Sequence, residues 1–217
     1  MFVKKEFFES GKESWFVEFK RYKYFILISL IVVSIAIYAD YLSGTYVSSA
    51  RVADVPDLII DHIGPYDLSF LFVYGYLFLV FLLFLNPIIF HIGRLHRVVG
   101  QFSLLILIRS FFIVFTHLQT PLDAIAVNFP WPFEGLSFLN DLFFSGHVAV
   151  PFLGFLIFRK NGSSILKYLF LFGSIIMSLT VLLMHQHYSI DVFAAFFITY
   201  SSYKLGEFLF KKIRADF

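Results

Sequence analysis

Long apolar runs alternate with short polar segments along almost the whole chain, and this alternation is the dominant pattern of the sequence. A bilayer core about 30 Å thick needs about 20 apolar residues in helical conformation, and six runs approach this length. The pattern therefore predicts an all-α fold, a polytopic membrane protein built as a bundle of six transmembrane helices. The six predicted spans are residues 24–42, 68–89, 99–116, 142–158, 165–184 and 188–210.

The polar segments divide the chain into three parts. Residues 1–23 are charged and aromatic, which is typical of an amphipathic helix lying at the cytoplasmic membrane surface. Residues 24–210 contain the spans and mostly short connections, so we expect a single membrane domain that carries the catalytic site. Residues 211–217 form a basic cytoplasmic tail.

The basic residues predict the orientation of the spans. Fifteen of the 17 Lys and Arg residues precede the first span, follow the last, or lie between spans two and three or four and five. The positive-inside rule places this side, with both termini, in the cytoplasm. The other side holds most of the acidic residues and keeps two basic ones, Arg51 and Arg109.

Composition narrows the class of protein. Of the 217 residues, 59% are hydrophobic and 15% are charged, whereas soluble domains are about 45–50% apolar and about 25% charged. These values exclude a cytosolic enzyme and a disordered chain, and the absence of Cys excludes a disulfide-stapled module. A net charge of +2 does not argue for nucleic acid as a partner. We expect the membrane and its lipids as partners, and a homo-oligomer is left open.

Chain length and composition also suggest in which membrane the protein is located. A short, Cys-free chain rich in Phe and Ile hints at a bacterial cytoplasmic membrane. The non-cytoplasmic side would then face the periplasm or the exterior, and in a eukaryote it would be lumenal.

Arg109 lies inside the third predicted span. An ionisable residue in a span costs a few kcal/mol, so it is a functional hypothesis by default. A guanidinium suits phosphate oxygens, which predicts an anion-binding Arg at the bottom of a cavity. The alternative is a structural ion pair with a carboxylate that holds the bundle together.

A second polar segment opens the fourth span after a loop rich in Pro and aromatic residues. Asp141 is predicted to be the N-cap of this helix. Free backbone N–H groups at a helix start bind anions, so Ser145 and Gly146 are expected beside a phosphate. His147 follows directly. Taken alone, this segment is more typical of a hydrogen-bonded structural His.

The third polar segment opens the sixth span. His187 and Asp191 are four residues apart, so they share a face if both are helical. A carboxylate beside an imidazole fixes its tautomer and raises its basicity. His185 would point elsewhere. A buried His–Asp pair without chemistry is the alternative. Metal binding is weaker, since two His and one Asp need further ligands. We expect neither a metal nor a cofactor.

Together these residues, drawn from three spans at similar depth, suit phosphoryl transfer. In-line attack of His187 on phosphorus would produce a phosphohistidine. His147 would protonate the leaving oxygen and then act as a base toward water or an alcohol. Arg109 and the amides at the helix start would stabilise the equatorial oxygens.

The motifs resemble those of the type 2 phosphatidic acid phosphatase superfamily, and within it the sphingomyelin synthase branch. The resemblance covers residues 100–205. It rests on Asp-x-x-Phe-Ser-Gly-His at 141–147, on His-x-His-Tyr-Ser-Ile-Asp-Val at 185–192, and less strongly on 109–121. It implies His187 as nucleophile, Asp191 as its partner and His147 as acid and base, with Arg109 and Asp141 at the phosphate.

The predicted function is that of a membrane enzyme that cleaves a lipid phosphoester on the non-cytoplasmic face. It would pass the phospho-headgroup to a lipid alcohol such as ceramide or diacylglycerol, or to water. A plain phosphatidic acid or isoprenoid phosphate phosphatase is the alternative. Two readings from other classes are an ion-coupled transporter and a bis-His haem protein with His147 and His187 as axial ligands.

Overall fold

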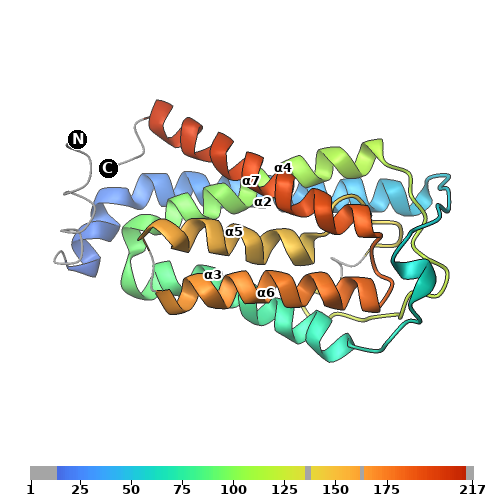
Figure 1. Ribbon diagram of the computed structural model, residues 1–217. Coiled ribbons are helices and arrows are strands. Elements are labelled where there is room, and N and C mark those ends of the chain that lie inside the picture. The colour runs from blue at the N-terminus through green and yellow to red at the C-terminus, as the bar shows by residue number, and fades with distance from the viewer. Residues whose placement is uncertain (1–13, 135–137, 162–163, 214–217) are drawn as a thin grey trace.

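The computed structural model describes residues 14–134, 138–161 and 164–213, and six long helices within them form a bundle (Figure 1). In these ranges no β-strand is formed, and an isolated bridge pairs Ala53 with Leu118. Three short helices occupy Ile60–His62 (η2), Leu71–Gly75 (η3, a π-helix) and Ile92–Arg94 (η4). The long helices are Trp15–Ser49 (α2), Tyr76–Phe90 (α3), Leu95–Phe115 (α4), Gly146–Asn161 (α5), Ser164–Leu183 (α6) and Ser189–Lys212 (α7).

Within the described residues, four helical segments are long and apolar enough to cross a membrane: α2, η3 with α3, η4 with α4, and α6. The chain is therefore an all-helical protein with several candidate membrane spans. The predicted fourth and sixth spans correspond to α5 and α7, which are not among these four. The helix α5 has 16 residues, and α7 carries Asp191, Lys204 and Glu207 within its length. The count of six spans stays a prediction.

The start of α2 differs from the expected division of the chain. The helix runs without a break from Trp15 to Ser49, so the residues expected in a separate interfacial segment up to position 23 continue directly into the first span. Residues 1–13 lie outside the described part of the chain, as do residues 214–217 of the expected basic tail. Lys211 and Lys212 belong to the last turn of α7.

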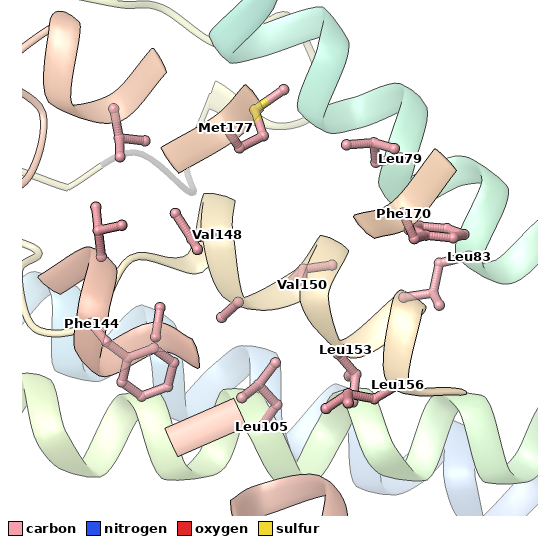
Figure 2. Packing of buried hydrophobic residues seen from close by; sticks show 14 of the residues in the cluster. Leu79, Leu83, Leu105, Phe144, Val148, Val150, Leu153, Leu156, Phe170 and Met177 are labelled. Carbon is pink, nitrogen blue, oxygen red and sulfur yellow. The ribbon is translucent and has the colours of Figure 1, made fainter. Parts of the chain in front are cut away.

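The core of the bundle is built around α5. Val148, Val150, Leu153 and Leu156 are completely buried, and the cluster to which they belong includes side chains from α3, α4, α6 and α7 (Figure 2). Gly154 allows α6 to approach closely, because a Cβ atom there would lie 2.4 Å from a ring carbon of Phe170. A short central helix can thus be surrounded by protein on all sides.

The two ends of the bundle are different in kind. At one end α2 begins, α7 ends, and α3 turns into α4 (Figure 1). At the opposite end lie the connections from α2 to η3, from α4 to α5 and from α6 to α7, which we call the loop end. The predicted site residues are close to the loop end.

Candidate active site

His187 and Asp191 form a buried pair at the start of α7. His187 Nδ1 lies 3.1 Å from Asp191 Oδ2, and the Asp191 side chain is completely buried. The same oxygen accepts the N–H of Tyr188 at 3.2 Å. Their spacing predicts that the two residues share one face of a helix. The helix begins at Ser189, however, so His187 lies just before it and only Asp191 is helical. Instead Asp191 reaches back from the first turn to the residues just before it.

The segment before α5 forms a turn rather than a helix. The helix begins at Gly146, so the prediction that Asp141 caps it is wrong. Asn140 and Phe143 adopt positive φ values of 60° and 54°, and Asn tolerates this region better than most residues. Asn140 Oδ1 accepts a hydrogen bond from the backbone N–H of Thr120 at 2.9 Å, and the backbone N–H of Asn140 donates to Thr120 Oγ1 at 2.9 Å. This turn directs Asp141 toward α4.

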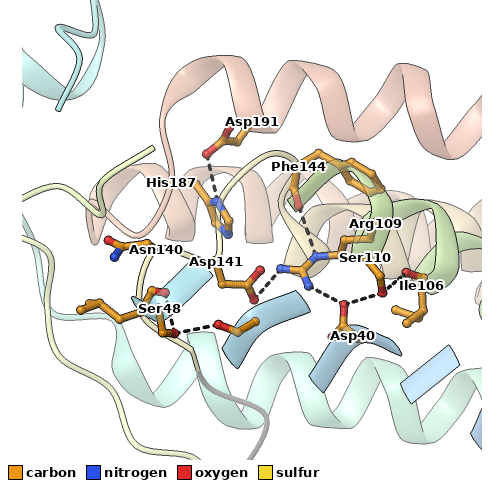
Figure 3. Close-up of polar contacts among 12 residues, drawn as sticks. Asp40, Ser48, Ile106, Arg109, Ser110, Asn140, Asp141, Phe144, His187 and Asp191 are labelled. Carbon is orange, nitrogen blue, oxygen red and sulfur yellow. Dashed lines mark hydrogen bonds and ion pairs between the residues drawn. The ribbon is translucent and has the colours of Figure 1, made fainter. Parts of the chain in front are cut away.

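Arg109 is buried on α4 between two carboxylates (Figure 3). Its Nη2 lies 2.7 Å from Asp141 Oδ2, and its Nη1 lies 3.0 Å from Asp40 Oδ1 on α2. Its Nε donates to the Phe144 carbonyl at 3.4 Å. This arrangement has features of both interpretations of Arg109. Its ion pairs join α4 to α2 and to the turn before α5, as a structural Arg would, and its side chain also lines a cavity, as an anion-binding Arg would. Asp40 was not predicted as a site residue.

Gly146 and Ser145 have different surroundings. Gly146 lines the cavity and leaves room for Arg109, because a Cβ atom there would lie 3.3 Å from the Arg109 Nε. Ser145 is completely buried and is not part of the cavity wall. Its N–H donates to the Asp191 carbonyl at 3.3 Å, which links this turn to α7. A phosphate contact of Ser145 stays a prediction.

His147 lies in the first turn of α5 against two rings from the neighbouring helices. Its imidazole stacks on Phe72 of η3 with ring centroids 3.8 Å apart, and the ring of Tyr76 lies 4.2 Å away. Among the described residues, no group hydrogen-bonds to its buried Nε2. A buried polar atom without a partner is uncommon and points to a missing ligand or solvent molecule. The two rings restrict the orientation of the imidazole.

A cavity of about 1160 Å³ brings these residues together. Arg109, Asp141, His147 and His187 line it near the loop end, together with Asp40. Along α4 its wall extends from Arg109 to Leu95, a distance of about 21 Å at 1.5 Å per residue. Apart from the polar end, the walls are mainly aliphatic and aromatic. The cavity is therefore long and amphiphilic, with the candidate catalytic groups at one end.

His185 belongs to a second, separate pocket. Its Nδ1 lies 2.9 Å from Asp123 Oδ1, and the Asp123 side chain is 58% exposed. This pocket has a volume of about 480 Å³ and is lined by Asp54, Asp61 and Tyr188 among others. His185 thus points away from the cavity that His187 lines, as its position two residues earlier suggested.

Sequence reasoning missed Asp40, Phe72 and Tyr76. The signal for Asp40 was present, since an acidic residue inside the first predicted span meets the same criterion that singled out Arg109. The two aromatic residues had no such signal among 32 Phe and 12 Tyr. Within the described ranges, no group of three or more His, Cys, Asp and Glu is arranged to hold a metal ion.

Comparison with known families gives a match that covers the C-terminal part of the chain. Residues 140–207 match the family model described as PAP2 superfamily C-terminal, and the matched segment includes Asp141, His147, His187 and Asp191. The match supports the PAP2 superfamily and a membrane enzyme of phosphatase or phosphotransferase type. Arg109 and Asp40 precede the matched segment. No curated protein and no solved structure matches the chain.

Proposed function

We propose that this protein is an integral membrane lipid phosphotransferase, related to the sphingomyelin synthase branch, that cleaves a lipid phosphoester through a phosphohistidine. The observation that carries the proposal is the cavity itself. Two histidines, one with a buried carboxylate partner, lie at the polar end of a long apolar chamber. A lipid phosphoester needs a polar site for its headgroup and an apolar chamber for its acyl chains, and the cavity offers both.

The first half-reaction uses the His187–Asp191 pair. With its Nδ1–H donated to Asp191, His187 keeps a lone pair on Nε2. Attack of Nε2 on phosphorus forms an N–P bond while the bond from phosphorus to the leaving lipid oxygen breaks. His147 in its protonated form donates a proton to that oxygen, so a lipid alcohol leaves.

The second half-reaction reverses these roles. A lipid alcohol such as ceramide or diacylglycerol, or water, attacks the phosphohistidine and regenerates His187. The now neutral His147 takes the proton from the attacking hydroxyl. Arg109 keeps unused N–H groups that can donate to the equatorial phosphate oxygens. His147 thus donates one proton in the first half-reaction and takes one up in the second, so the protons balance over the cycle.

The apolar walls support a lipid substrate. The leaflet of a bilayer with a 30 Å core is about 15 Å thick, and the cavity extends about 21 Å along α4. Leu30 and Ile37 of α2 and Ile88 of α3 line the cavity, and their side chains are exposed. We propose that the cavity opens between these helices, where an acyl chain can enter from the surrounding lipid.

The proposal includes six spans with both termini in the cytoplasm. Within the described residues, the basic segments lie toward the end of the bundle where α2 begins and α7 ends, and the site is near the opposite, loop end. The positive-inside rule then directs the site to the periplasm, the exterior or a lumen.

A lipid panel tests the function. Purified protein in liposomes is incubated with phosphatidylcholine, phosphatidylethanolamine or phosphatidic acid, each with and without ceramide or diacylglycerol, and without added metal. We expect headgroup release or transfer by the wild type. His187→Ala should lower it by at least about 10³-fold, because the nucleophile is lost. His185→Ala is the matched control and should retain most activity. Equal turnover by wild type and His187→Ala would refute the proposed nucleophile.

A further inference from the structure

The environment of Arg109 raises a question about which phosphate it can accept. A guanidinium has five N–H donors, and three of them are engaged here by Asp40, Asp141 and the Phe144 carbonyl (Figure 3). Two N–H groups are left for a substrate. Arg109 therefore reaches the cavity already neutralised by carboxylates rather than as an unpaired cation.

Asp40 supplies half of this neutralisation from an unexpected place. It lies on α2, 69 residues from Arg109, and its side chain is 18% exposed. Its Oδ1 accepts the Arg109 Nη1–H at 3.0 Å, and the Ser110 hydroxyl lies 3.3 Å from the same oxygen. Asp40 also lines the cavity, so its charge acts directly on whatever occupies the polar end.

The ion-paired cluster at the polar end carries a net negative charge. Arg109 contributes one positive charge, whereas Asp40 and Asp141 in their ionised form each contribute one negative charge, which leaves a net −1 for the cluster. Beyond the cluster, Asp191 contributes a further negative charge, and His147 contributes a positive one when it is protonated for the first half-reaction. A phosphomonoester carries a charge of about −1.5 to −2 at pH 7, because its second pKa is about 6. A phosphodiester carries a single negative charge, because its second acidic group is esterified. Like charges repel strongly in a chamber with apolar walls.

We propose that Asp40 determines specificity, so that its charge beside Arg109 makes the site favour a phosphodiester over a phosphomonoester dianion. The inference rests on the proposed phosphoester cleavage and adds the residue that selects the charge of its substrate. Asp40 acts by setting the charge that Arg109 presents and by holding the guanidinium in place. It does not form or break a bond.

The test compares two lipids with the same acyl chains. Phosphatidic acid is the monoester, and phosphatidylmethanol is a diester without a cationic group. The readout is the ratio of kcat/KM for monoester over diester, measured from pH 5 to pH 8. The diester at the same pH corrects for titration of the enzyme. In the wild type this ratio should fall as the monoester gains its second charge near pH 6.

Asp40→Asn should raise the ratio about tenfold at pH 8 and little at pH 5, because one unit of negative charge is removed at hydrogen-bonding range. Asp40→Glu keeps the charge and should keep the wild-type ratio. Ser110→Ala removes the other neighbour of the Asp40 carboxylate without changing any charge, and it should also keep the ratio. Thermal unfolding of each variant monitors the fold.

Two outcomes would overturn the inference. In the first, Asp40→Asn lowers turnover of both lipids by the same factor at every pH, which assigns Asp40 a structural role alone. In the second, the wild type prefers the monoester dianion.

If the wild type cleaves neither of these two lipids, the charge selection is decided by binding. The proposed function itself fails only if the wild type is also inactive toward the whole lipid panel described above. Calorimetry would compare a short-chain alkylphosphonate dianion with its monomethyl ester. We expect the wild type to bind the ester more tightly and Asp40→Asn to lose this preference. An equal preference in both proteins refutes the inference.

Discussion

Two histidines that are separated by one residue each contact a carboxylate, yet the two pairs have different surroundings. The His187–Asp191 pair is closed off, with a fully buried carboxylate and an imidazole that lines the long cavity. The His185–Asp123 pair has a carboxylate that is 58% exposed, and it lines the smaller pocket at the loop end. The two contacts, at 3.1 and 2.9 Å, are almost equal in length. The difference teaches that a His–Asp distance alone does not identify a catalytic pair, because burial of the carboxylate and access to a substrate chamber decide what it can do.

The strongest test of the difference between the two pairs is to neutralise each carboxylate in turn. Asp191→Asn should lower kcat for the lipid substrate by about 10²-fold, since the amide no longer fixes the reactive tautomer of His187. The loss should be smaller than that of His187→Ala, because Asp191 orients and polarises but does not attack. Asp123→Asn, measured in the same liposome assay, should change kcat by less than about threefold. Equal losses in the two Asn variants would show that the pairs share one role.

His147 offers a second contrast with His185, because only His147 is proposed to move a proton to the leaving group. His147→Ala should lower turnover by about 10²-fold for a substrate with a poor alkoxide leaving group. With a p-nitrophenyl ester, whose p-nitrophenolate leaves without protonation, the loss should be much smaller. His185→Ala should show no dependence on the leaving group. The same fold-loss of His147→Ala on both esters would argue against acid catalysis.

The smallest predicted effect is a change in thermal stability at Asp57, whose carboxylate accepts the backbone N–H of Ser189 at the start of α7. Burial raises the pKa of the Asp57 carboxyl, but hydrogen bonds from the backbone N–H groups of Ile59, Ser189 and Ile60 outweigh it and leave the pKa lowered. A carboxylate with a lowered pKa stabilises the fold above its unfolded-state pKa of about 3.9, and this contribution is lost as the pH falls through the folded-state pKa.

Asp57→Asn should therefore lower the Tm at pH 7 by about 2–4 °C, the size of one lost cap in a chain of this length. Thermal unfolding in detergent at a series of pH values measures it. The difference between variant and wild type should begin to shrink as the pH falls below about 3.9, the unfolded-state pKa, and should vanish only below the lowered pKa of the folded-state carboxyl. A difference that stays constant as the pH is lowered through this range would exclude the charge of Asp57 as its origin.

The helices themselves could largely be predicted from the sequence. Each of the six apolar runs corresponds to a long helix, because in both lipid and a protein core the backbone must satisfy its own hydrogen bonds. The helix starts at the loop end were harder to predict. The fourth run was expected to begin at residue 142, but α5 begins at Gly146, since the preceding residues form a turn with positive φ at Asn140 and Phe143.

The candidate site was predictable in part for a similar reason. His187 with Asp191, and the segment from Asp141 to His147, are local motifs whose residue types and spacing are visible in one stretch of chain. The partners of Arg109 are not local. Asp40 and Asp141 lie 69 residues before and 32 residues after it, and no spacing rule connects them. The ring that stacks on His147, Phe72, is equally distant in sequence.

By itself, the sequence determined that this chain is helical and apolar, which ends of the helices are basic, and which few polar residues stand near or inside apolar runs. These properties follow from composition and local spacing. The tertiary structure decided that Arg109 is shared by two carboxylates, that His147 and His187 line one chamber, and that His185 lines another pocket. Such choices depend on how α2, α3 and α4 pack around α5, and packing is set by contacts between residues far apart in the chain.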